Sequence, residues 1–186
     1  MWYLIKSLLV ILLLTGCHSA PLRPETTYDI TARQALYKTS YWSFTGRLAI
    51  NKQKQSWQAN IHWQHQIDKD IIKLSGPLGQ GATIIELTDD LVSINRGDGK
   101  LQTSTQVEAF INQQLGLFVP VKSLRYWVMG LPDKQLAVNY NALGFYQKNW
   151  LVEYNEMQPV NNVALPRKMT VLNEQVKLKL IVDKWD

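Results

Sequence analysis

The sequence predicts a mainly β fold class: a half-open antiparallel β-barrel, formed by one curved sheet, with α-helices covering a hydrophobic cavity. One observation is that apolar and polar residues alternate in many short segments, most clearly over residues 57–63, Trp-Gln-Ala-Asn-Ile-His-Trp. This period of two is typical of antiparallel strands with one buried face. A second observation is that two amphipathic helical segments interrupt the series of strands. Their apolar faces must pack against another element, and the sheet is the one available. So many antiparallel strands are too many for a flat sheet, which favours an open or closed barrel.

The chain of 186 residues starts with a leader that does not belong to this fold. Lys6 is followed by an apolar run over residues 8–14, which is too short for the roughly 20 residues of a membrane-spanning helix. Residues 1–16 are therefore interpreted as a signal peptide that is removed. The tetrapeptide Leu-Thr-Gly-Cys at 14–17 resembles the bacterial lipobox, in which the cysteine thiol is acylated before cleavage. The alternative is an ordinary secretory cleavage site that happens to precede a cysteine.

Lipidation would explain Cys17, because it is the only cysteine of the chain and cannot form an internal disulfide. Residues 17–27 contain two prolines and no periodicity, so we expect a lipidated N-terminus and an extended tether. In bacterial lipoproteins an Asp after the cysteine commonly retains the protein in the inner membrane. The residue here is His18, which favours the outer membrane. The expected location is therefore its periplasmic face, with Cys17 as the anchor and residues 28–186 as a single domain.

The periodicities predict the elements of that domain in order. Residues 28–39 are expected to form a helix, and the strand patterns that follow lie at 42–51, 55–66, 70–76, 81–88, 91–96 and 100–103. Thr105 and Glu108, in capping-box spacing, predict a helix that ends before Gly116. Pro120 opens a second helix, which Gly130 ends. The remaining strands are predicted at 135–140, 143–147, 149–155, 167–173 and 175–182.

The composition argues against several classes of function. The formal net charge is +5, without a basic cluster longer than a pair, which gives nucleic-acid binding little support. A weak attraction to anionic lipid headgroups remains open, although a modestly basic surface is the simpler interpretation. His62 and His65 point to opposite faces of a strand and cannot share a metal ion. The pairs Asp68/Asp70 and Asp89/Asp90 are interpreted as turn residues. We therefore expect no enzyme activity, no metal and no cofactor.

The apolar content, 46% of the residues, provides the candidate binding site. An apolar cavity can bind a lipid chain by shape and hydrophobicity, without protonation chemistry. The alternative, common in small barrels, is that side chains simply fill the interior. The candidates for lining an acyl-chain cavity are Trp57, Ile61, Trp63, Ile84, Leu115, Trp127, Leu131, Leu178 and Leu180.

A turn with an unusual composition follows the third strand pattern. It reads Gly76-Pro77-Leu78-Gly79, with a large apolar residue where turns usually carry small or polar ones. Pro77 and Gly79 suit a type I turn with Leu78 at its third position, which can present the side chain outward. The alternative is that Leu78 folds back on its own hairpin.

Several motifs together resemble the LolB family of outer-membrane lipoprotein receptors. They are the lipobox, the Pro-rich tether, Trp-Ser-Phe-Thr-Gly-Arg-Leu-Ala-Ile from residue 42, Gly-Pro-Leu-Gly from 76, Leu-Arg-Tyr-Trp-Val-Met-Gly-Leu-Pro from 124, Leu-Pro-Arg-Lys-Met from 165 and Val-Lys-Leu-Lys-Leu from 176. The resemblance implies a receptor that accepts acylated lipoprotein cargo from a periplasmic LolA-like carrier. It also implies insertion of that cargo into the inner leaflet of the outer membrane, without covalent chemistry.

The resemblance also gives Leu78 a role, since a leucine in a protruding loop of this family is implicated in membrane targeting of the cargo. The matching loop here consists of Gly76, Pro77, Leu78 and Gly79. We expect a monomer that does not bind nucleic acid. Two other functions stay open: an outer-membrane scaffold that binds protein partners through a sheet edge, and, less favoured, a lipid-processing hydrolase.

Overall fold

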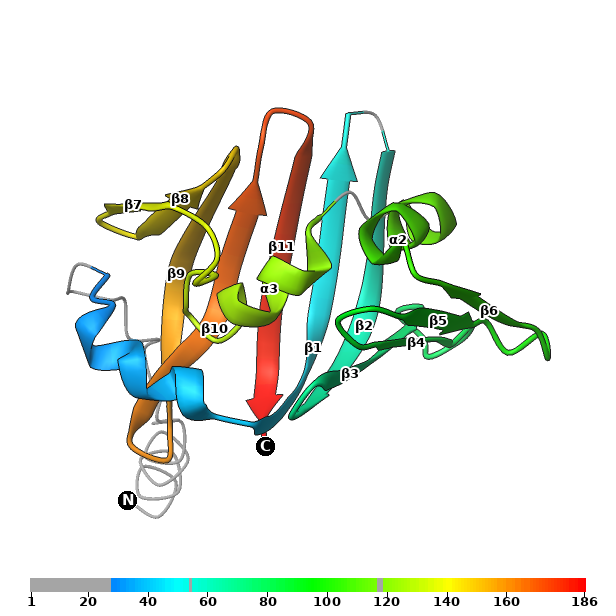
Figure 1. The fold of residues 1–186 in the computed structure, drawn as a ribbon, viewed down its shortest axis with the longest axis horizontal. Helices are drawn as coiled ribbons and strands as arrows, with labels where there is room; N and C mark the ends of the chain where they lie inside the picture. The colour runs from blue at the N-terminus through cyan, green and yellow to red at the C-terminus, as the bar shows by residue number, and fades with distance from the viewer. Residues whose placement is uncertain (1–27, 54, 117–118) are drawn as a thin grey trace, which may run out of the picture.

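The computed structural model describes residues 28–53, 55–116 and 119–186. Its centre is an 11-stranded antiparallel sheet with the strand order β6-β5-β4-β3-β2-β1-β11-β10-β9-β8-β7. Strand β1 (Tyr41–Lys52) pairs with β11 (Val176–Trp185), so the two ends of the domain join its halves in the middle of the sheet. The predicted mainly β class with one curved, open antiparallel sheet is confirmed (Figure 1).

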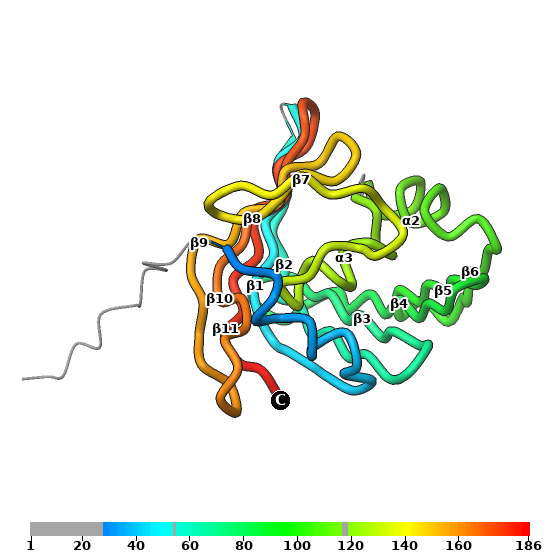
Figure 2. Tube along the Cα trace, turned by 60° about the vertical axis from the view of Figure 1, so that its left-hand side comes forward, coloured from blue at the N-terminus to red at the C-terminus, as the bar shows by residue number. Residues whose placement is uncertain are grey.

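The first half of the domain contains the short N-terminal 3₁₀ helix, strands β1 to β6 and the two helices that follow them in the chain. The bounds are η2 Thr31–Lys38, β2 Gln55–Gln66, β3 Lys69–Ser75, β4 Thr83–Leu87, β5 Val92–Asn95, β6 Leu101–Ser104, α2 Val107–Leu115 and α3 Val121–Trp127. In Figure 2 the strands β3–β6 turn away from the plane of β9–β11, and α2 and α3 lie in the angle between them. The helices therefore cover the concave side of the sheet.

The second half consists of hairpins alone. Its strands are β7 Val138–Asn141, β8 Gly144–Gln147, β9 Trp150–Val160 and β10 Val163–Leu172. Strands β9 and β10 are longer than predicted because they continue to a tight turn at Asn161 and Asn162, whose φ angles are 47° and 67°. Asparagine tolerates this left-handed backbone, which two-residue hairpin turns require. No helix in the described ranges is long and apolar enough to cross a membrane.

Alternation along the central strands builds the core. In β1, Trp42, Phe44, Gly46, Leu48 and Ile50 are buried, and the residues that alternate with them are more exposed. Gly46 breaks the register of β1 against β11 with a bulge, and a Cβ there would lie 2.3 Å from the carbonyl oxygen of Ile181. The close approach of the two backbones at this point therefore requires glycine.

Candidate functional site

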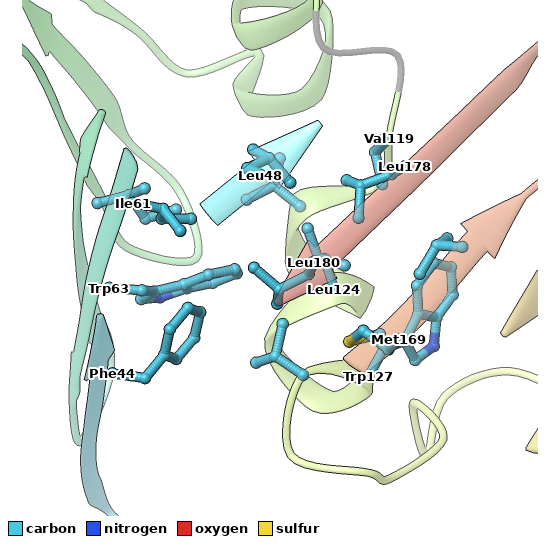
Figure 3. Close-up of a cluster of buried hydrophobic side chains, with 14 of the residues drawn as sticks. Phe44, Leu48, Ile61, Trp63, Val119, Leu124, Trp127, Met169, Leu178 and Leu180 are labelled. Carbon is cyan, nitrogen blue, oxygen red and sulfur yellow. The ribbon is translucent and has the colours of Figure 1, made fainter. Parts of the chain in front are cut away.

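A small apolar cavity lies between the concave face of the sheet and α3. Its volume is about 30 Å³, roughly the share of one water molecule, and no polar side chain lines it. In Figure 3, Leu48, Ile61 and Trp63 face Leu124 of α3 across this space. The other lining residues are Ile72, Leu74, Ile85, Ile111, Val119, Val121 and Leu178. The side chains thus nearly fill the interior in this closed conformation.

An open groove adjoins the cavity at Leu74, which lines both. The groove has a volume of about 240 Å³. Trp57, Ala59 and Leu115 contribute its apolar walls, and Gly76 and Gly81 of the β3–β4 loop form part of its rim. The cavity beneath α3 and the groove beside the β3–β4 loop therefore adjoin at one side chain, that of Leu74.

The candidate cavity residues divide among these sites. Ile61, Trp63 and Leu178 line the closed cavity, whereas Trp57 and Leu115 line the groove. Leu131 lines a different pocket of about 170 Å³ near η2. Trp127 and Leu180 are fully buried in the same hydrophobic core.

The placement of Ile84 corrects its expected role. Two isoleucines are adjacent at 84 and 85, and the pairing of β4 with β3 and β5 turns Ile85 toward Ile72 and Ile94. Ile85 is 1% exposed and lines the cavity, whereas Ile84 lies on the opposite, outer face of the sheet. The cavity residue of β4 is therefore Ile85.

The turn at 76–79 projects Leu78 into solvent, with 92% of the residue exposed. The Gly79 N–H donates to the Gly76 carbonyl oxygen at 2.8 Å, which closes a four-residue turn with Pro77 second and Leu78 third. Only Gly79 has a positive φ in this turn, at 82°, which suits glycine at the last position of a type I turn. The side chain of Leu78 therefore does not fold back on its hairpin.

The side chain of Asn60, on β2, is hydrogen-bonded to this loop. Its Nδ2 donates to the carbonyl oxygens of Gly76 at 3.2 Å and Pro77 at 3.3 Å. The Gly76 N–H also donates to the Gln80 carbonyl oxygen at 2.8 Å. The loop thus presents Leu78 on a hydrogen-bonded base, and the sequence offered no local signal for this role of Asn60.

Glu108 joins the two helices that cover the sheet. Its carboxylate accepts hydrogen bonds from the backbone N–H groups of Val121 at 2.9 Å and Lys122 at 3.0 Å, at the first turn of α3. The predicted capping box is wrong, because the first turn of α2 has no side-chain cap and Glu108 caps the next helix instead. An acidic side chain is favourable there because the first N–H groups of a helix lack partners.

The last turn of α3 is attached to the sheet by a buried ion pair. Arg125 Nε lies 2.6 Å from Asp70 Oδ2, and Asp70 is 0% exposed. The other carboxylate oxygen accepts the Trp63 Nε1–H at 2.8 Å and lies 3.0 Å from His65 Nδ1. Asp70 is therefore part of the interior at the start of β3, not the turn residue that its spacing from Asp68 predicted. Among the described residues, Arg125 Nη2 is buried without a hydrogen-bond partner.

The segment after α3 is fastened to the second half of the sheet. Gln147 of β8 accepts the Trp127 Nε1–H at 2.8 Å and donates to the carbonyl oxygen of Asp133 at 2.8 Å. The Tyr154 hydroxyl donates to the Trp127 carbonyl oxygen and the Tyr28 hydroxyl to that of Gly130, both at 2.9 Å. Burial raises the pKa of Tyr154 and of Tyr28 well above the usual range, so both phenols stay protonated as donors.

A metal ion in a protein is bound by a cluster of side chains. In the described ranges, no group of three or more His, Cys, Asp or Glu side chains is arranged to hold a metal ion. His65 is committed to Asp70, and His62 lies on the other face of β2. The described site is therefore one of apolar surfaces, with charges that attach the covering helices.

Comparison with known proteins agrees with this geometry. The family model described as outer membrane lipoprotein LolB matches residues 40–185. The chain belongs to the LolB family. The LolB of Nitrosococcus oceani is 32% identical over 193 residues, which cover 96% of this chain and 94% of that protein. The LolB of Chromohalobacter salexigens is 29% identical over 188 residues, covering 96% and 87% of the two chains.

A solved structure shows that the fold extends beyond LolB. A LolA superfamily protein from Nitrosomonas europaea superposes with a TM-score of 0.51 at 6% identity, covering 80% of this chain and 86% of that one. At this identity the likeness concerns the fold alone. The relatives are named outer-membrane lipoproteins, which confirms the predicted outer-membrane localisation of this family member. The predicted lipidation residue, Cys17, lies outside the described residues.

Proposed function

We propose that this member of the LolB family accepts acylated lipoproteins from a periplasmic LolA-like carrier and inserts them into the inner leaflet of the outer membrane. The observation that supports the proposal is that the apolar cavity beneath α3 and the groove at Trp57 and Leu115 share Leu74, which suggests a path toward the loop that exposes Leu78. Such a path suits acyl chains that move between a protein interior and a bilayer. Cys17 holds the protein at that bilayer through its own lipid.

Cargo binding in this proposal requires α3 to move. A space of about 30 Å³ has room for about one water-sized group, far less than an acyl chain. Because Glu108 caps α3 from α2, the two helices would move together as a lid. Val121 and Leu124, which now fill the cavity from α3, would leave room for the chain between the lid and Ile61, Trp63 and Leu178.

Transfer without covalent chemistry or a nucleotide must run on differences in affinity. Burying one methylene group contributes about 0.8 kcal/mol, so a few more buried methylenes at each step give the relay a direction. The bilayer, which buries the whole chain, is the natural end of that sequence. No cofactor is needed for such a transfer.

Replacing the lipidated cysteine tests whether the domain alone binds cargo. The Cys17→Ala chain is expected to be soluble and still to capture an acylated lipoprotein from the carrier, because the apolar path lies within residues 28–186. Co-purification measures the capture, with the same cargo lacking its acyl chains as the control. Equal capture of both forms would favour a protein-binding scaffold, and no capture by a folded chain would contradict the cavity.

Removing the amide that holds the Leu78 loop should loosen it without unfolding the domain. Asn60→Ala deletes two hydrogen bonds to the loop, each worth about 0.5–1.5 kcal/mol. We expect faster hydrogen exchange at the Gly79 amide and cargo insertion lowered several-fold. Gln58→Ala, at an exposed position of the same strand, is the control. Unchanged exchange at Gly79 would show that Asn60 does not hold the loop.

A further inference from the structure

A second hairpin tip lies at the same end of the sheet as the Leu78 loop. Strands β3 to β6 are consecutive and antiparallel, so the β3–β4 loop and the β5–β6 turn are both at the end where Ser75 stops and Thr83 begins. The two segments are neighbours, since a Cβ on Gly97 would lie 4.0 Å from the carbonyl oxygen of Ala82. The β5–β6 turn, residues 96–100, is exposed throughout.

Leu101, directly after this turn, is an apolar residue that the core does not use. It is 65% exposed. Register places it opposite Asn95, which in turn lies opposite Ile84, so Leu101 shares the outer face of the sheet with Ile84. This face explains why Ile84 is absent from the cavity. Leu101 and the half-buried Ile84 therefore lie on the outer face of the sheet, at the end where the β3–β4 loop exposes Leu78.

Charge distinguishes this end from the opposite one. The β5–β6 turn carries Arg96 and Lys100 with one acidic residue, Asp98, and the Leu78 loop is uncharged. The turns at the opposite end, β2–β3 and β4–β5, carry Asp68, Asp89 and Asp90. Apolar residues are exposed there too, with Ile67 at 65% and Leu91 at 46%, so exposure alone does not separate the ends. The sign of the charge does.

Hydrogen bonds hold the β5–β6 turn that carries Arg96 and Lys100. Arg96 Nη2 donates to the carbonyl oxygen of Gln114 and lies 3.1 Å from its Oε1, which ties the turn to α2. The Asp98 carboxylate accepts the backbone N–H of Lys100 at 3.0 Å. Within the described residues, the Lys100 ammonium makes no hydrogen bond or ion pair. The Lys100 ammonium is therefore available to bind a phosphate group of a lipid, if Leu78 and Leu101 contact the membrane.

We propose that the β5–β6 hairpin is a second membrane contact, in which Lys100 and Arg96 bind anionic phospholipid headgroups while Leu101 enters the bilayer beside Leu78. This inference rests on the proposed function, because it assumes that the Leu78 end meets the membrane. Two apolar contacts and two cations would fix the orientation of the domain at the membrane, which the single contact of Leu78 would not. A basic residue near an anionic membrane contributes about a fivefold gain in binding.

The chain offers a direct test, because the sulfur of its only cysteine carries the lipid in the proposed mature protein. Leu101→Cys then introduces the single free thiol, which takes an environment-sensitive fluorophore on the lipidated protein. In mixed phosphatidylcholine–phosphatidylglycerol vesicles we expect a blue-shifted emission that nitroxide-labelled lipids quench. Pure phosphatidylcholine, or about 1 M salt, where the Debye length is about 3 Å, should weaken both signals. Ile67→Cys, with equal exposure at the opposite end, is the matched control and should stay in water.

Charge reversal tests the headgroup contact. Lys100→Glu on the Leu101→Cys chain should lower the quenching at least about fivefold in the anionic vesicles, whereas Lys179→Glu on the outer face of β11 should leave it unchanged. A fluorophore at Leu101→Cys that behaves like the one at Ile67→Cys overturns the inference. If a Leu78→Cys fluorophore is quenched in that case, the proposed membrane role of Leu78 still stands. If the fluorophore at Leu101→Cys is quenched but the protein does not capture acylated cargo, the membrane contact stands and the proposed function is contradicted.

Discussion

Asp70→Asn is expected to lower the free energy of unfolding by about 3–5 kcal/mol, the typical loss when one partner of a buried ion pair is removed. The carboxylate is fully buried and is shared by Arg125, Trp63 and His65. Asparagine keeps the size but leaves the guanidinium of Arg125 with only the exposed carboxylate of Asp89, 3.5 Å away, as a counter-charge. Urea denaturation followed by tryptophan fluorescence measures the change, because Trp63 and Trp42 lie beside the cluster.

A matched ion pair on the surface gives the control. Arg47 and Asp183 approach to 2.7 Å, but their side chains are 61% and 47% exposed, so Asp183→Asn should shift the unfolding midpoint little. The double variant Asp70→Leu with Arg125→Met should regain only part of the loss, since it removes both charges of the pair but leaves the buried Trp63 Nε1–H without its acceptor. If Asp70→Asn destabilises no more than Asp183→Asn, the buried pair does not hold the domain together.

The same substitution should affect α3 before the rest of the fold. Arg125 lies in the last turn of α3, and its ion pair with Asp70 fastens that turn to β3. In Asp70→Asn we expect amide hydrogen exchange to accelerate more in α3 than in the central strand β1, because local opening then costs less than global unfolding. Equal acceleration in both would show that the pair stabilises the whole core without acting as the fastening of a lid.

Local pattern was sufficient for most of the sheet. Strand β2 coincides with its predicted range, 55–66, because apolar residues alternate over its whole length and turn residues bound it. Strands β9 and β10 extend beyond their predicted ranges, 149–155 and 167–173, and the added parts include Pro159 and Pro166. Pro166 fits because the register of β10 against β9 shifts directly after it, and proline in sheets is typical of such irregular positions.

The polar part of the site could not be read from neighbouring residues. Glu108 looked like a cap for its own helix, but its partners are the N–H groups 13 and 14 positions later. Asp70 looked like a turn residue beside Asp68, but Arg125 lies 55 positions away. Likewise, two adjacent isoleucines do not say which one faces the core, and only pairing with β3 and β5 decides for Ile85. These choices depend on tertiary contacts rather than on periodicity.

Leu78→Glu is expected to block the insertion of cargo while leaving folding and cargo capture nearly intact. Leu78 is 92% exposed and packs on nothing in the core, so its replacement should change the free energy of unfolding by less than about 0.5 kcal/mol. Burying a leucine in the bilayer contributes about 1.5–3 kcal/mol, which corresponds to a roughly tenfold to hundredfold preference for the membrane-engaged state. A carboxylate removes this contribution and adds the cost of placing a charge in the headgroup region.

The measurement is the fraction of acylated cargo that moves from the loaded protein into vesicles, with capture from the carrier assayed separately. Leu78→Met should retain insertion because it keeps an apolar side chain of similar size, and Ile67→Glu should retain it because that turn lies at the other end of the sheet. Leu78 cannot anchor the protein, since stable attachment takes about two lipid-type signals, and in the proposed function Cys17 provides the anchor. Its effect must therefore appear at release, and insertion that survives Leu78→Glu would mean that the acyl chains leave the groove without help from this turn.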